Sequence, residues 1–151
     1  MTRLLPCVLL IVLLISACSN NSKKDESPCA NCCFSSETLR FRIVDARNGD
    51  DLVFGAHATI PVDSIRFIHN GKQVLESHQA PWDKNVLYGP ESWPNLQLEV
   101  GRPGKATREK LTITPKEINC CVTAINAVTL GENPVPLKKD SAGVYLIPYS
   151  L

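Results

Sequence analysis

Short runs in which apolar and polar residues alternate place the strongest constraint on what this chain can fold into. Residues 39–44, 96–100 and 118–125 each carry apolar side chains at every second position. Because successive side chains of a strand point to opposite faces, this period of two predicts strands buried on one face. No stretch of the domain keeps a helical period. The pattern therefore predicts an all-β domain with almost no helix.

Turn signals separate these runs. Asn70-Gly71 lies between two β-rich stretches, residues 64–68 and 73–75, and predicts a hairpin. Asn48-Gly49 predicts another turn, and Pro115 is expected to end a strand at 111–114. About six to nine short strands at this spacing favour an antiparallel Greek-key β-sandwich over residues 33–151.

The amino end has a different composition. One basic residue, Arg3, precedes an almost unbroken apolar run over residues 4–15, and a polar stretch follows at 19–27. The run is too short to cross a bilayer core as a helix, which takes roughly 20 residues. Its length and its order of segments are typical of a signal peptide.

The end of this run resembles the lipobox of bacterial lipoproteins, an aliphatic residue and two small residues before a cysteine: Ile15, Ser16, Ala17 and Cys18. The resemblance implies that Cys18 carries lipid and that cleavage occurs before it. Residues 1–17 would then be the signal peptide, 18–32 a lipidated flexible tether and 33–151 the β domain. An ordinary secretory signal followed by an unrelated cysteine is the alternative.

Two further features bear on location. Ser19 stands where an aspartate would favour retention in the inner membrane, so the outer membrane is expected. Residues 22–26 include two lysines followed by two acids, which resembles the surface-export signal of Bacteroidetes lipoproteins; a solvated tether explains them equally. The chain as a whole resembles the small lipoproteins of Bacteroidetes.

Residues 41–56 resemble the opening of carboxypeptidase regulatory-like and transthyretin-like domains. A strand is followed by Asp45, a turn with Gly49 and a step into the next strand, with Asp51 where that family usually has proline. The resemblance implies a Greek-key sandwich and no particular activity.

Charge excludes one class of partner. The chain has 16 Lys and Arg and 15 Asp and Glu, and only Arg3 of these lies in residues 1–17, so 15 of each sign remain in the mature chain. A neutral domain lacks the basic surface that nucleic acids need. The expected partners are the membrane, through lipid on Cys18, and an envelope protein or a glycan.

Five other cysteines follow Cys18, and export would place them in an oxidising compartment where disulfides form. We expect a bridge from the amino-terminal group to the late pair. Cys33 is nearest the first strand, and Cys121 is favoured over Cys120 because neighbours on a strand face opposite ways. The same opposition argues against a shared metal ion, and no cofactor is expected. The candidates are Cys29, Cys32, Cys33, Cys120 and Cys121.

No active-site motif is recognisable. His57, His69 and His78 lie in separate segments, without a nucleophile elbow, paired carboxylates or a phosphate loop. We therefore expect a protein that is not an enzyme.

Two groups of residues are candidates for modification or binding. Ser64 and Ser141 each follow an aspartate and precede an aliphatic or small residue, like the O-glycosylation motif of Bacteroidetes, although local turn bonds explain the pattern equally. Aromatic side chains in the loop-rich middle of the chain could grip a sugar or a protein, or seal the edge of the core. These are Trp82, Tyr88 and Trp93.

These observations lead to an expected function. The chain is expected to be a membrane-anchored envelope lipoprotein with a non-catalytic binding or structural domain. An accessory subunit of a surface glycan-uptake or adhesion complex is the alternative, and an enzyme is the least favoured.

Overall fold

The computed structural model describes residues 35–76, 78–79, 83–91, 93, 95–101 and 105–150. The chain divides into two units, residues 1–31 and 32–151, and all described residues belong to the second. Cys18, Cys29, Cys32, Cys33 and Trp82 lie outside the described residues. Within the described part there is no helix long and apolar enough to span a membrane.

The described residues form an all-β domain, as predicted. One turn of 3₁₀ helix, Val62–Ser64, precedes the third of ten strands. The count exceeds the predicted six to nine because three strands have only two residues. The strands are β1 (Ser35–Ser36), β2 (Arg40–Asp45), β3 (Ile65–His69), β4 (Lys72–Glu76), β5 (His78–Gln79), β6 (Leu87–Tyr88), β7 (Leu96–Val100), β8 (Thr107–Asn119), β9 (Val122–Leu130) and β10 (Tyr145–Tyr149).

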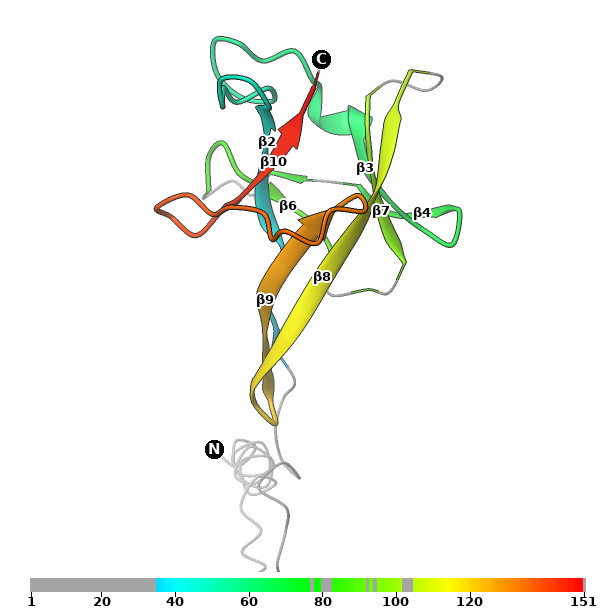
Figure 1. Cartoon of the computed structure of the whole chain (residues 1–151), viewed down its shortest axis with the longest axis vertical. Coiled ribbons are helices and arrows are strands. Elements are labelled where there is room, and N and C mark those ends of the chain that lie inside the picture. Colours follow the sequence, from blue (N-terminus) through cyan, green and yellow to red (C-terminus); the bar gives the residue numbers. More distant parts are fainter. Residues whose placement is uncertain are drawn as a thin grey trace, which may run out of the picture. The chain divides into compact units, whose positions relative to one another are not determined.

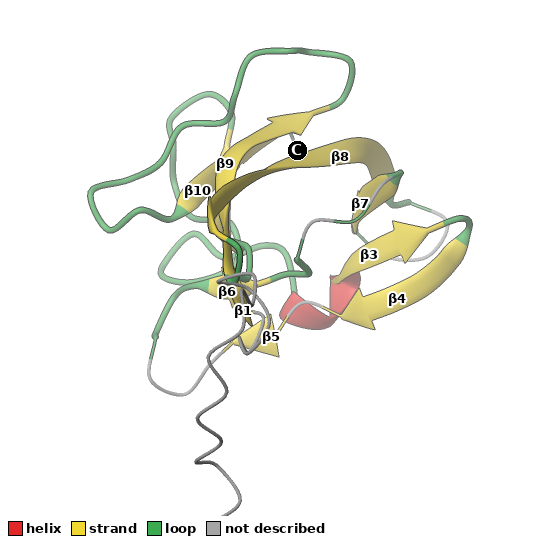
Figure 2. Ribbon diagram, turned by 90° about the horizontal axis from the view of Figure 1, so that it is seen from below, coloured by secondary structure: helices red, strands yellow, loops and turns green. Residues whose placement is uncertain are grey.

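These strands make two sheets. One has the order β1-β9-β8-β7-β3-β4 and the other β10-β2-β6-β5. Figure 2 shows β8 arching from β9 to β7, so that the six-stranded sheet is strongly curved.

Both sheets are mixed, so the expectation of purely antiparallel pairing was wrong at two places. β1 runs parallel to β9, and β10 runs parallel to β2. In the second pair Tyr145 lies opposite Phe41 and Ile147 opposite Ile43. All four side chains are buried. The pairing therefore places the apolar side chains of both strands on the same buried face of the sheet, although about 100 residues separate the strands in sequence.

One apolar core joins the sheets. Phe41 of β2 and Phe67 of β3 are fully buried and meet edge to face, with ring centroids 5.7 Å apart and planes at 82°. Such aromatic pairs contribute roughly 0.5–1.5 kcal/mol beyond their buried area. The core draws on both sheets, with contributions that include Leu39, Ile43, Leu87, Tyr145 and Ile147 on one side and Ile65, Leu96, Leu98, Leu111, Ile113 and Val128 on the other.

The predicted hairpin at Asn70-Gly71 is confirmed. These residues join β3 to β4 with backbone φ angles of 50° and 76°. Positive φ at both turn positions is the conformation whose twist matches the flanking strands, and Asn-Gly adopts it at little cost.

The longest hairpin corrects the interpretation of Pro115. The strand does not end there: β8 continues to Asn119, and its pairing with β9 shifts register between Thr114 and Pro115. A proline cannot donate a ladder hydrogen bond, but a bulge does not require one. As Figure 1 shows, the turn end of the β8–β9 hairpin extends well away from β3, β4 and β10.

The same hairpin corrects the placement of the late cysteines. Cys120 and Cys121 form the two-residue turn between β8 and β9, rather than the middle of one strand. Asn119 Oδ1 accepts the Cys121 N–H at 2.9 Å, which supports the turn locally. Ile118 and Val122, expected on the core side, are 56% and 38% exposed.

The start of the described chain lies beside that turn. The Ser35 N–H donates to the Cys121 carbonyl oxygen at 2.8 Å, and the Glu37 N–H donates to Thr123 at 2.9 Å. The Glu37 carboxylate also accepts the Ile125 N–H at 2.7 Å. β1 therefore covers part of the β9 edge, which would otherwise present unpaired backbone groups.

The turn after β2 depends on Asp45. Its carboxylate accepts the backbone N–H of Arg47 at 2.8 Å and the Arg47 guanidinium at 2.7 and 3.1 Å. These bonds lower the pKa of Asp45 to about 2. Gly49, with φ of 80°, completes the predicted turn by donating to the Asp45 carbonyl at 2.8 Å.

Gly89 provides a test of how tightly the sheets pack. A Cβ added to Gly89 would lie 2.7 Å from Phe67 and 3.3 Å from Leu39. Because Phe67 is fully buried and cannot swing away, we expect Gly89→Ala to lower the free energy of unfolding by about 1–3 kcal/mol. Urea denaturation of the two proteins measures this, and an unchanged midpoint would show that the sheets pack loosely.

Candidate functional site

The outer face of the smaller sheet carries the candidate site. Arg40 of β2 lies opposite Tyr88 of β6 in the sheet register. Because Phe41 and Ile43 turn inward to the core, the alternate side chains of β2, Arg40 and Arg42, turn outward. We call the surface formed by Arg40, Arg42, Asp83, Tyr88 and Asp140 the arginine ledge.

Asp83 is the centre of this ledge. One of its oxygens, Oδ2, accepts hydrogen bonds from Arg40 Nε at 3.2 Å, Arg40 Nη2 at 2.7 Å and the Tyr88 hydroxyl at 2.8 Å. The side chains of Arg40 and Asp83 are 36% and 24% exposed. Three donors on one oxygen fix the orientation of the carboxylate while leaving the group open to solvent.

The hydrogen bonds to Asp83 also shift the pKa values of Asp83 and Tyr88. The bond from Tyr88, followed by that from Arg40, lowers the pKa of Asp83. The same carboxylate raises the pKa of Tyr88, and burial adds to this effect. At neutral pH the group therefore holds one carboxylate, one guanidinium and a protonated phenol. A carboxyl group with a lowered pKa is poorly suited to general acid catalysis near pH 7.

The second arginine extends the ledge along β2. Arg42 Nε donates to the Asn85 carbonyl at 2.9 Å, and Arg42 Nη1 lies 3.5 Å from Asp140 Oδ2. The Asp140 carboxylate also caps its own loop by accepting the N–H groups of Ala142 and Val144 at 2.8 and 3.0 Å. Each arginine thus lies against one aspartate, and the ledge carries little net charge.

The two described aromatic candidates, Tyr88 and Trp93, contact different residues. Tyr88 belongs to the ledge, whereas Trp93 is 41% exposed and meets His69 edge to face at 5.4 Å. Trp82 lies outside the described residues. Of the described aromatic candidates, only Tyr88 therefore belongs to the candidate site.

The serine candidates differ in accessibility. Ser64 is 5% exposed, and its hydroxyl donates to the Pro61 carbonyl at 2.6 Å, which is the local turn bond considered as the alternative. Ser141 is exposed beside Asp140. Of these two serines, only Ser141 is exposed enough for a modifying enzyme to reach it.

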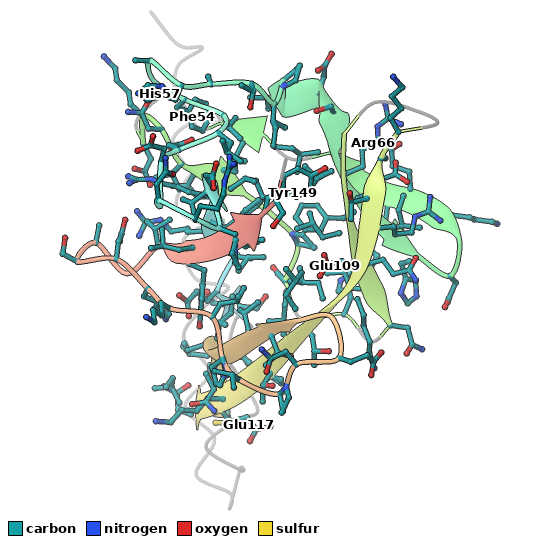
Figure 3. The ribbon with its side chains drawn as sticks, turned by 45° about the horizontal axis from the view of Figure 1, so that its top comes forward. Phe54, His57, Arg66, Glu109, Glu117 and Tyr149 are labelled. Atoms are coloured by element: carbon teal, nitrogen blue, oxygen red, sulfur yellow. The ribbon has the colours of Figure 1, made fainter. Side chains whose placement is uncertain are left out.

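The histidines are not brought together. His57 is 73% exposed, with Nε2 4.0 Å from Asp50 Oδ2, and Figure 3 shows it beside Phe54 at the opposite end of the domain from Glu117. His69 contacts Trp93, and β5 places His78 opposite Tyr88 in register. Within the described ranges no group of three His, Cys, Asp or Glu side chains could hold a metal ion.

A second polar cluster lies on the outer face of the larger sheet. Glu99 of β7 is flanked across the sheet by Arg66 of β3 and Arg108 of β8. Arg108 donates two hydrogen bonds to Glu99, and Arg66 Nη1 lies 3.8 Å from it. This arrangement is a cross-strand ladder that neutralises the carboxylate, and it supports the sheet.

The sequence pattern predicts part of the candidate site. The alternation over residues 39–44 places Arg40 and Arg42 on one outer face. Their partners, Asp83 and Asp140, are 43 and about 100 residues away and carry no motif, so only the folded chain brings them together. Comparison with known proteins adds no relative: no protein-family model, curated protein or solved structure matches the chain.

The coupling of Tyr88 to Asp83 gives a test of the site geometry. In the variant Asp83→Asn the carboxylate is lost, so the pKa of Tyr88 should fall back towards the ordinary tyrosine value of about 10. NMR titration of ring-labelled tyrosine measures this, with Tyr88→Phe identifying the signal. An unchanged Tyr88 titration in Asp83→Asn would contradict the hydrogen bond.

Proposed function

We propose that this chain is a cell-envelope lipoprotein, held to the membrane by lipid on Cys18, whose β domain binds or assembles rather than catalyses. The observation that carries the proposal is the order of segments at the amino end: a basic residue, the apolar run of 4–15, the box ending in Cys18 and a polar stretch. Lipid chains on Cys18 would anchor firmly, since each buried methylene contributes roughly 0.8 kcal/mol.

For location we propose the outer membrane, with display at the cell surface. Ser19 after the lipidated cysteine and the lysine-acid stretch at 22–26 support this. A role as an accessory subunit of a surface glycan-uptake or adhesion complex is the second candidate.

The arginine ledge is the proposed binding surface of the domain. Its partly exposed guanidinium and phenol groups can donate and accept hydrogen bonds. Because each arginine lies against an aspartate, the ledge suits a neutral polar ligand such as a glycan better than an anion.

For the fold we propose a Greek-key sandwich related to the transthyretin-like domains. The common core of the two sheets and the Asp45 turn after β2 support this.

The anchor is tested by substitution of the acceptor cysteine. Cys18→Ser removes the only thiol at the box, so labelling of the protein by an alkyne fatty acid and its retention in the membrane fraction should both be lost. Cys7→Ser is the matched control, because Cys7 lies within the apolar run and should leave labelling unchanged. Equal labelling of Cys18→Ser and the parent protein would refute the proposal.

A further inference from the structure

We propose that the tip of the β8–β9 hairpin, residues 116–122, docks on the bilayer that holds the lipid of Cys18, with Ile118 and Val122 inserted among the lipids. The inference rests on the proposed function, because it takes Cys18 as the point of attachment. Cys18 lies outside the described residues, and only its position in the sequence is used. The hairpin tip itself is described throughout.

The hairpin tip presents apolar side chains to solvent. Ile118 and Val122 are two of the four large apolar side chains that are exposed in the described part of the chain. In the register of the hairpin Val122 lies opposite Asn119, and a shift between Glu117 and Asn119 leaves Ile118 as the extra residue of a bulge. The two apolar residues therefore occupy neighbouring positions on either side of the turn, at the end of the hairpin.

The described chain begins beside the hairpin tip. Ser35 lies opposite Val122, and the Ser35 N–H donates to the Cys121 carbonyl oxygen at 2.8 Å. The 16 residues 19–34 separate Cys18 from Ser35 in the sequence. Even a fully extended chain of this length spans at most about 60 Å. The chain from the proposed anchor therefore enters the domain at the hairpin tip and keeps that tip near the bilayer.

The other two exposed apolar side chains lie farther from this entry point. The loop that carries Val135 returns to the far part of β9, where the Leu137 N–H donates to the Val128 carbonyl oxygen at 2.7 Å. Six residues of strand, or roughly 20 Å, separate Val128 from Val122. Trp93 packs on β3, two strands beyond β8 in the sheet. The hairpin tip is thus the exposed apolar group that reaches the bilayer with the least extension of the chain.

The charges of the hairpin tip indicate how it would be held. Lys116 and Glu117 are adjacent and exposed, and their opposite charges cancel. Anionic lipid headgroups would therefore neither attract nor repel the tip appreciably. The contact would depend on the removal of apolar surface from water at the boundary between headgroups and acyl chains. Salt, which screens charges, should change such a contact little.

Attachment at Cys18 makes a weak contact sufficient. Two apolar side chains would bring a free protein to a bilayer only weakly. In the anchored protein the contact forms within one assembly, where a short linker gives an effective concentration in the millimolar range. The hairpin tip can therefore stay docked, and the orientation of the domain becomes fixed. Leu111 and Ile113, the core residues at the other end of β8, would lie away from the bilayer.

The test uses the mature, acylated protein in nanodiscs of phosphatidylethanolamine and phosphatidylglycerol, with a small share of lipid that carries a nitroxide at the top of its acyl chain. We expect the methyl NMR signals of Ile118 and Val122 to be lost through paramagnetic broadening, whereas the exposed Val135 should keep most of its intensity. Reduction of the nitroxide by ascorbate gives the reference intensities. Equal broadening of all three residues, or of none, would overturn the proposal.

A double variant tests whether the apolar side chains cause the docking. Ile118→Asn with Val122→Asn makes the hairpin tip polar and leaves the core intact, because both positions are exposed. The methyl group of Ala124, two residues after Val122, then reports the contact: its broadening should be lost in the double variant. Broadening of Ala124 should persist in the matched control Val135→Asn and at high salt. Persistence in the double variant, or loss at high salt, would refute apolar docking.

Lipid on Cys18 in the same sample separates this inference from the proposed function. An acylated chain that stays in the nanodiscs but keeps sharp Ile118 and Val122 signals would refute the docking alone. A chain without lipid on Cys18 that does not enter the nanodiscs would refute the proposed anchor, and the docking with it.

Discussion

The edge-to-face contact of Phe41 and Phe67 is the interaction on which the rest of the domain depends. It joins the two sheets at residues that are fully buried, and Gly89 leaves room for it. Because Phe41 points inward, its neighbours Arg40 and Arg42 point outward, where they meet Asp83 and Asp140. The position of the arginine ledge thus follows from the packing of the core behind it.

The β8–β9 hairpin has two parts with different means of support. Near β7 its residues Leu111, Ile113 and Val128 belong to the core. Towards the turn at Cys120 and Cys121, β8 is exposed, and hydrogen bonds from Ser35 and Glu37 support that edge of β9. Local stability should therefore decline along the hairpin towards the turn, which is where a covalent tie would have most effect.

Sequence patterning predicted the local features well and the distant ones poorly. Period-two alternation identified β2 and β7, and Asn70-Gly71 identified the β3–β4 turn, because each signal lies within a few adjacent residues. The parallel pairing of β10 with β2 and the contacts of Arg40 with Asp83 join residues far apart in sequence, so no local pattern reveals them. Pro115 and the cysteine turn were misinterpreted because a bulge and an Asn119 cap override the simple strand rules.

The central claim is that export and lipid on Cys18 place this β domain at a membrane. The intact mass of the protein extracted from the envelope tests it most directly, since one measurement reports both the first residue and its modification. The account predicts a chain that begins at Cys18 and carries the mass of a diacylglyceryl group. A chain that retains residues 1–17, or one that begins at another residue without lipid, would contradict it.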